Sequence, residues 1–137
     1  DALRLQPDFE EAQVGLAHAL REAGSYRAAA RVYGEVLARS SQNVQALEGL
    51  AICQWRLGRT EEAEQLLRKA LEVQPVRKEA AVSLSHTMGD LLYSQRRYGE
   101  ALDYWEKSLE LDPTQSSLRT LVEDLRQYVA RYGPSPR

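Results

Sequence analysis

The chain has 137 residues, in which 18 Lys and Arg nearly balance 20 Asp and Glu, so the formal charge is −2. This composition argues against a nucleic-acid partner, because affinity for phosphate depends largely on an excess of Lys and Arg. It also excludes a membrane span, because no stretch approaches the ~18 consecutive apolar residues that a transmembrane helix requires.

Cysteine usage bears on the compartment. Cys53 is the single cysteine, so no internal disulfide is possible. A lone cysteine favours the reducing cytoplasm, although a periplasmic protein without disulfides would have the same composition. The sequence leaves both compartments open.

Apolar side chains recur at helical spacing through residues 10–43. The first stripe is Leu16, Ala17 and Leu20, and the second is Ala29, Tyr33, Val36 and Leu37. Each stripe predicts a helix with one apolar face. Between them Gly24 stands where a helix end can turn left-handed without a Cβ penalty. This segment is predicted to be a helix-turn-helix unit.

The same pattern occurs twice more along the chain. A shift of 34 residues places Gly24 on Gly58, and a further shift of 38 places Leu67 on Trp105. The predicted units are residues 10–43, 44–77 and 78–115. Four extra residues at 78–81 most simply lengthen the first helix of the third unit by about one turn. This extension is either a tolerated insertion or a ledge for a partner.

The unit boundaries have their own signals. Prolines occur at 7, 75 and 113, where one unit is expected to end and the next helix to begin. The first unit has no such proline at its end. There Ser40, Ser41 or Asn43 is expected to cap the next helix with its side chain.

Both ends of the chain depart from the repeated unit. Residues 1–9 align with the closing turn of a unit, and we expect them to be the end of a truncated preceding repeat. Residues 116–132 carry a further apolar stripe, consisting of Leu118, Leu121, Val122, Leu125, Val129 and Tyr132. They are predicted to form a capping helix, or alternatively a linker helix to a following domain. Residues 133–137 are the predicted tail.

Three phased copies of this pattern resemble the tetratricopeptide repeat, a pair of antiparallel helices about 34 residues long. In the third copy Arg96 stands where the family has glycine. The resemblance covers residues 1–137 as a single domain. It implies an all-α fold, a right-handed α-solenoid of helix-turn-helix repeats closed by a C-terminal capping helix.

No arrangement of residues in the sequence indicates catalysis. The chain has no phosphate-binding glycine loop, no nucleophile elbow and no Cys or His pair at metal-ligand spacing. Cys53 falls on the packed side of its helix, where we expect an inert core thiol. His18 and His86 are two repeats apart, too far to share a zinc ion. We therefore predict no enzyme activity, no cofactor and no metal.

The remaining candidate is a surface. In a solenoid of helix pairs the first helices line the concave side, and the residues that meet a partner lie off the packing stripe. The candidate residues are His18, Arg21, Glu48, Ile52, Trp55, Arg56, His86, Asp90 and Tyr93. Val14 is expected on the same face as His18. Trp, Tyr and Arg are common binding hot spots, so Trp55 and Tyr93 are the expected anchors. Trp55 equally fits a packing role between adjacent first helices.

These positions predict a protein-interaction scaffold or adaptor that binds a peptide segment of a partner in its concave groove. Relatives that grip acidic chaperone tails use Lys, Asn, Asn, Lys and Arg as a carboxylate clamp. The matching residues here are Val14, His18, Gly49, Ser83 and Thr87. None agrees, so the clamp is not expected. The alternatives are a self-assembly module that forms a homo-oligomer and the non-catalytic targeting region of a larger enzyme.

Overall fold

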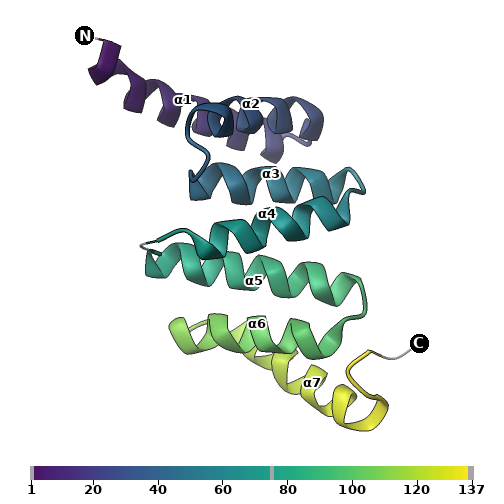
Figure 1. Cartoon of the computed structure of the whole chain (residues 1–137). Coiled ribbons are helices and arrows are strands. Elements are labelled where there is room, and N and C mark those ends of the chain that lie inside the picture. The colour runs from purple at the N-terminus through teal and green to yellow at the C-terminus, as the bar shows by residue number, and fades with distance from the viewer. Residues whose placement is uncertain (1, 75, 136–137) are drawn as a thin grey trace. The chain divides into compact units, whose positions relative to one another are not determined.

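A computed structural model describes residues 2–74 and 76–135 of the chain. The described residues form helices and no strands, and they belong to two compact units, Asp1–Val73 and Gln74–Arg137. The N-terminal unit contains α1 (Ala2–Glu22), α2 (Tyr26–Arg39), α3 (Val44–Arg56) and α4 (Thr60–Glu72) (Figure 1). The C-terminal unit contains α5 (Lys78–Ser94), α6 (Tyr98–Leu111) and α7 (Ser116–Tyr132). The boundary predicted at Pro75 lies outside the described residues, as do Asp1, Pro136 and Arg137.

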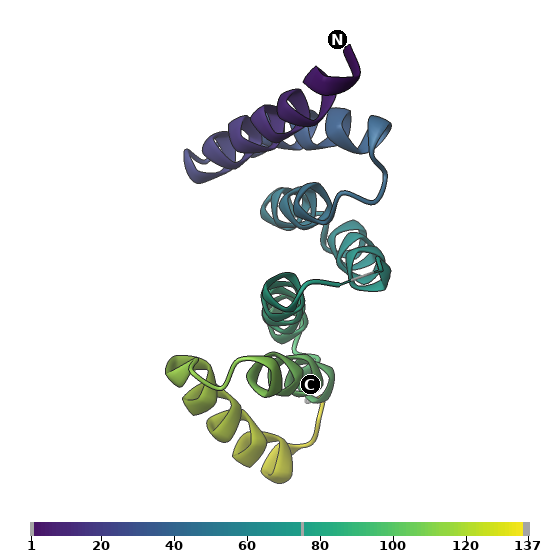
Figure 2. The same ribbon diagram turned by 90° about the vertical axis from the view of Figure 1, so that its left-hand side faces the viewer.

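In the N-terminal unit the helices pack in chain order. α1 contacts α2, α2 contacts α3 and α3 contacts α4, and α1 also reaches α3. Figure 2 shows α3 and α4 nearly end on, side by side. The core cluster consists of Val14, Ala17, Ala29, Tyr33, Val36, Ala46 and Cys53. The predicted stripes therefore supply most of this core.

The first helix corrects two expectations. Val14 was expected on the partner-facing side but is buried, with 4% of its surface exposed, whereas Leu16 of the predicted packing stripe is 54% exposed. α1 packs on α2 and α3 through Val14 and Ala17, and Leu16 lies about 100° from Ala17 around the helix. α1 also continues through Pro7, where a boundary was predicted. Proline has a helical φ, so near a helix start it costs a hydrogen bond without ending the helix.

The three turns within helix pairs share one hydrogen-bond pattern. Ser25 N–H donates to Leu20 O at 2.8 Å, and Arg59 N–H donates to Gln54 O at 2.8 Å. Gly24 and Gly58 occupy the left-handed position of this C-cap, with φ of 84° and 85°. In the third turn Arg96 takes the same conformation with φ of 61°. The packing of the helix pair thus outweighs the conformational free energy that a non-glycine residue costs in the left-handed region.

The structure confirms two further expectations from the sequence, a side-chain cap at the start of α3 and the greater length of α5. Asn43 caps α3, because its side-chain oxygen accepts a hydrogen bond from Ala46 N–H at 3.0 Å. α5 has 17 residues against 13 in α3, as expected from the four extra residues at 78–81.

The C-terminal unit is built by α5 packing on α6 and α6 packing on α7. Its buried apolar residues are Leu84, Met88, Leu91, Leu92, Ala101, Leu102, Trp105, Leu118, Val122 and Leu125. On α7 the predicted stripe is only partly buried, because Leu121 is 46% and Tyr132 is 56% exposed. Leu121 and Tyr132 lie at one edge of the α7 face that packs on α6. Among the described residues, no helix has the length and hydropathy needed to span a membrane.

Candidate functional site: the first-helix faces

The nine predicted partner-binding residues lie on the first helix of each helix pair. We call the set on α1 and α3 the N-terminal first-helix face and the set on α5 the C-terminal first-helix face. The former comprises His18, Arg21, Glu48, Ile52, Trp55 and Arg56, and the latter comprises His86, Asp90 and Tyr93. None of the nine is buried: Arg56 and Tyr93 are exposed and the others are half-buried. Neighbouring Ala17, Ala51, Cys53 and Gly89 are buried, so each face borders directly on the core.

On the N-terminal face the structure brings His18, Arg21 and Glu48 together. The imidazole Nδ1 of His18 is hydrogen-bonded to the hydroxyl of Tyr33, and the two rings are 5.5 Å apart between centroids. Tyr33 itself is fully buried on α2. A buried aromatic side chain of α2 therefore contacts and orients a half-buried histidine of α1.

The same cluster sets the protonation of His18. Burial lowers the pKa of His18, the Arg21 guanidinium lowers it further, and the Glu48 and Glu22 carboxylates oppose both effects. A neutral Nδ1 can accept a hydrogen bond from the Tyr33 hydroxyl, whereas a protonated ring cannot. We therefore assign the phenol as donor, an arrangement that fits the lowered pKa.

This assignment predicts a pH dependence. Because the folded pKa of His18 lies below its ordinary value of 6.5, the unfolded chain binds the proton more readily. The stability that His18 contributes is therefore present above that value and is lost as the pH falls below it. We expect the wild-type chain to lose more stability from pH 7 to pH 5 than His18→Gln, which still offers an acceptor to Tyr33 but does not titrate. Urea unfolding followed by circular dichroism measures the difference, and equal losses in the two chains contradict the assignment.

On the C-terminal face Trp105 plays the part that Tyr33 plays in the other unit. Trp105 is 3% exposed, and its indole N–H donates to Asp90 Oδ1 at 3.1 Å and to the His86 carbonyl at 3.3 Å. Its ring lies 5.4 Å from that of Tyr93 between centroids. One buried indole thus contacts all three predicted residues of this face: the Asp90 carboxylate, the His86 backbone and the Tyr93 ring.

His86 connects this face to the start of α7. Its Nδ1 lies 3.2 Å from Gln115 Oε1, and its Nε2 lies 3.6 Å from Asp90 Oδ1. Burial raises the pKa of Asp90, while nearby His86 and the Trp105 hydrogen bond act to lower it. The Trp105 indole on α6 therefore donates a hydrogen bond to this carboxylate of α5, and the His86 ring lies nearby.

The sequence did not point to Tyr33 and Trp105 as neighbours of the candidate residues. Both occupy the same repeat position, both are buried, and both extend a polar tip to a first helix. Each ring also lies against a glycine. A Cβ added at Gly49 would lie 2.2 Å from Tyr33 Cζ, and one added at Gly89 would lie 2.1 Å from Trp105 Cδ1. The available signal was the polar handle of Tyr and Trp, which usually finds a partner when it is buried.

The described residues contain no group of three or more His, Cys, Asp and Glu side chains placed to hold a metal ion. Cys53 is buried in the core, and burial raises the pKa of its thiol. A raised pKa leaves little thiolate, which is the nucleophilic form. Of the positions that match the carboxylate clamp, Val14 and Gly49 are buried and cannot present a side chain to a ligand.

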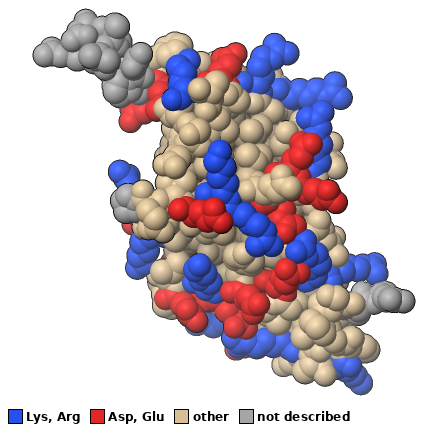
Figure 3. Space-filling model, in the orientation of Figure 1, with Lys and Arg blue, Asp and Glu red and all other residues tan. Residues whose placement is uncertain are grey.

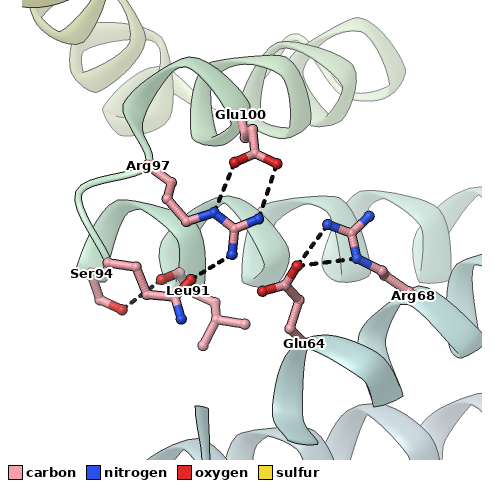
Figure 4. A network of polar contacts seen from close by, with 7 residues as sticks. Glu64, Arg68, Leu91, Ser94, Arg97 and Glu100 are labelled. Carbon is pink, nitrogen blue, oxygen red and sulfur yellow. Dashed lines mark hydrogen bonds and ion pairs between the residues drawn. The ribbon is translucent and has the colours of Figure 1, made fainter. Parts of the chain in front are cut away.

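Charged side chains on the surface form local pairs. Acidic and basic residues are interspersed on the side of the molecule shown in Figure 3. Just before α6 the Arg97 guanidinium donates to both carboxylate oxygens of Glu100, at 2.8 and 3.0 Å, and on α4 Arg68 pairs with Glu64 at 2.7 Å (Figure 4). Exposed pairs of this kind contribute little to stability. They produce a mixed surface rather than a field of one sign.

Comparisons with known proteins agree with this architecture. Models of the tetratricopeptide repeat match residues 14–80 and residues 83–115. No curated protein sequence matches the chain.

Several solved structures share the fold. The Pseudomonas aeruginosa PilF structure has a TM-score of 0.80 and 26% identity, over 98% of this chain and 60% of that one. A mutant of Thermobaculum terrenum O-GlcNAc transferase has a TM-score of 0.77 and 23% identity, over 90% of this chain and 23% of that one. The first TPR of Spaghetti (RPAP3), bound to the HSP90 peptide SRMEEVD, has a TM-score of 0.76 and 18% identity, over 88% and 93%. This chain therefore spans less than two thirds of the first two proteins.

The repeat matches, the helix pairs and the glycine turns all lead to the same classification. The chain belongs to the tetratricopeptide repeat family, and its fold is an all-α solenoid of helical repeats.

Proposed function

We propose that this chain is a protein-interaction module that binds a peptide segment of a partner protein on its first-helix faces. Tetratricopeptide repeats commonly mediate protein–protein interaction, and the Spaghetti (RPAP3) repeat of similar fold was solved with a peptide bound. The proposal assigns the anchoring contacts to Trp55 and Tyr93. It assigns the polar contacts to Arg21, Arg56, Glu48 and Asp90.

The main support for this proposal is the solvent exposure of the candidate residues. All nine candidate residues remain accessible to solvent although the residues adjacent to them in sequence form the core. Tyr93 combines 44% exposure with a ring packed near Trp105, so it offers apolar surface that is already ordered. An anchor that is fixed before binding loses little conformational entropy when the partner arrives.

The same geometry disfavours the carboxylate clamp as the mode of binding. A clamp needs side-chain donors at the positions of Val14 and Gly49, which are buried here. A side chain at Gly49 would also collide with the Tyr33 ring. The proposed partner is therefore a segment recognised along its length by aromatic and mixed polar contacts, not by a terminal carboxylate.

The test is a binding measurement on Trp55→Ala. Peptides selected from a displayed random library against the wild-type chain serve as probes, and their affinities are measured by calorimetry. If Trp55 is an anchor, Trp55→Ala is expected to weaken binding by about 2 kcal/mol or more, roughly a 30-fold higher Kd, with little change in melting temperature. Truncating a buried anchor at an interface costs this much because the partner's contacts lose the ring that they pack against.

Leu16→Ala is the matched control, since Leu16 is an exposed apolar residue of α1 outside the first-helix faces. It is expected to leave the affinity unchanged. A large drop in melting temperature for Trp55→Ala with unchanged affinity would assign Trp55 to packing instead. Equal losses in Trp55→Ala and Leu16→Ala would contradict the placement of the site.

A further inference from the structure

After α7 the chain turns back, and Pro134 lies against the start of α6 (Figure 1). Gly133, with φ of 93°, makes this reversal possible. The carbonyl of Pro134 then accepts two hydrogen bonds, from Tyr98 N–H at 2.8 Å and from Gly99 N–H at 3.0 Å. N–H groups in the first turn of a helix have no partner within the helix, so they are available to a peptide carbonyl from outside.

Gly99 is shaped for this contact. A Cβ added to Gly99 would lie 2.8 Å from Pro134 Cβ and 3.8 Å from Pro134 Cα, and it would meet no other atom within 4 Å outside its own helix turn. Glycine is otherwise less favourable than alanine within a helix. The missing side chain therefore serves the close approach of the proline and nothing else among the described residues.

Tyr98, in the first turn of α6, belongs to a group of four tyrosines that we call the tyrosine surface: Tyr93, Tyr98, Tyr128 and Tyr132. Their rings form a connected series, with centroids 5.2 Å apart from Tyr93 to Tyr98, 5.4 Å from Tyr98 to Tyr128 and 4.7 Å from Tyr128 to Tyr132. Tyr93, Tyr128 and Tyr132 are each more than 40% exposed. Aromatic rings of this kind are the usual surface on which proline-containing segments dock.

We propose that the first turn of α6 and the tyrosine surface form a docking site for a non-helical, proline-containing peptide segment, and that Pro134 occupies the first turn of α6 as an internal ligand. The chain itself shows the mode of binding, in which a proline carbonyl accepts from Tyr98 and Gly99 while its ring sits over the glycine. A partner segment of the same chemistry docks when it displaces the internal one. This site shares Tyr93 with the C-terminal first-helix face, but it does not include the other proposed anchor, Trp55.

The test uses the full chain and the peptide Gly-Pro-Ser-Pro-Arg, which repeats the sequence of residues 133–137. Pro134→Gly removes the internal ring and makes the segment more flexible, so the peptide added in solution competes more easily. We expect it to shift the amide NMR signals of Tyr98 and Gly99 in Pro134→Gly, with an apparent Kd about tenfold lower than for the wild-type chain.

The double variant Pro134→Gly with Gly99→Ala is the decisive control. Its added Cβ fills the space of the proline, so the peptide is expected not to bind, while the melting temperature stays equal to or above that of Pro134→Gly because alanine favours a helix. A peptide with alanine at both prolines is expected not to bind either chain. Unchanged Tyr98 and Gly99 signals in Pro134→Gly, or equal shifts in the double variant, would overturn the proposal. Trp55→Ala is expected to leave this binding intact, so failure here is separable from failure of the first-helix faces.

Discussion

Trp105→Ala is expected to destabilise the C-terminal unit by about 4 kcal/mol, the largest effect of any single change considered. The indole is 3% exposed and packs against α5. Its loss leaves a cavity and removes the 3.1 Å hydrogen bond that the indole N–H donates to Asp90 Oδ1. The free energy of unfolding in urea, followed by far-ultraviolet circular dichroism, measures the effect.

Trp105→Phe separates the two contributions. Phenylalanine keeps a large ring in the core but offers no donor to Asp90, so a smaller loss of roughly 1–3 kcal/mol is expected for the unsatisfied acceptor and the reduced volume. Tyr93 is also expected to become more mobile in Trp105→Ala than in Trp105→Phe, since its ring rests near the indole. A change of less than about 1 kcal/mol for Trp105→Ala would be inconsistent with a core position.

Gly89→Ala is expected to destabilise the same unit by about 2 kcal/mol, although alanine is intrinsically the better helix former. The added methyl would lie 2.1 Å from Trp105 Cδ1 and 2.3 Å from its Nε1, so the indole must move. Overpacking of this kind costs about 3 kcal/mol at its upper end, and helix propensity returns about 1. Gly49→Ala is expected to behave alike, because its Cβ would lie 2.2 Å from Tyr33 Cζ.

Gly34→Ala provides the matched control within α2. A Cβ at Gly34 meets no atom within 4 Å, so alanine there is expected to stabilise the chain by up to about 1 kcal/mol through helix propensity alone. The change in the free energy of unfolding is thus expected to have opposite signs for Gly34→Ala and for Gly89→Ala and Gly49→Ala, although all three glycines are helical. Stabilisation by Gly89→Ala, measured in the same urea experiment, would refute the close approach of the indole.

The repeat period was readable from the sequence because it follows from short-range chemistry. Apolar residues at helical spacing, Gly24 and Gly58 at left-handed turns and Asn43 as a helix cap are local features, and each acts within a few residues of its own position. They predicted the helix pairs, the family and most of the buried residues. The longer α5 followed from counting residues between equivalent positions.

The candidate site was predictable only as a set of helix positions. Periodicity correctly placed Asp90 and Tyr93 outside the core, but it put Val14 on the exposed side and Leu16 on the packed side. Two positions on adjacent sides of a helix differ in burial only through the neighbours that cover them. Those neighbours are α2 and α3, and the spacing of residues along α1 does not show how these two helices pack on it.

The amino-acid sequence by itself thus determined the repeated helix pair and its turns, because these depend on spacing along one helix. Only the tertiary structure decided that Tyr33 and Trp105 support the two first-helix faces and that Pro134 docks on Gly99. Each of these contacts joins residues on different elements and depends on distances of closest approach. Packing between elements, and not propensity within them, fixes such distances.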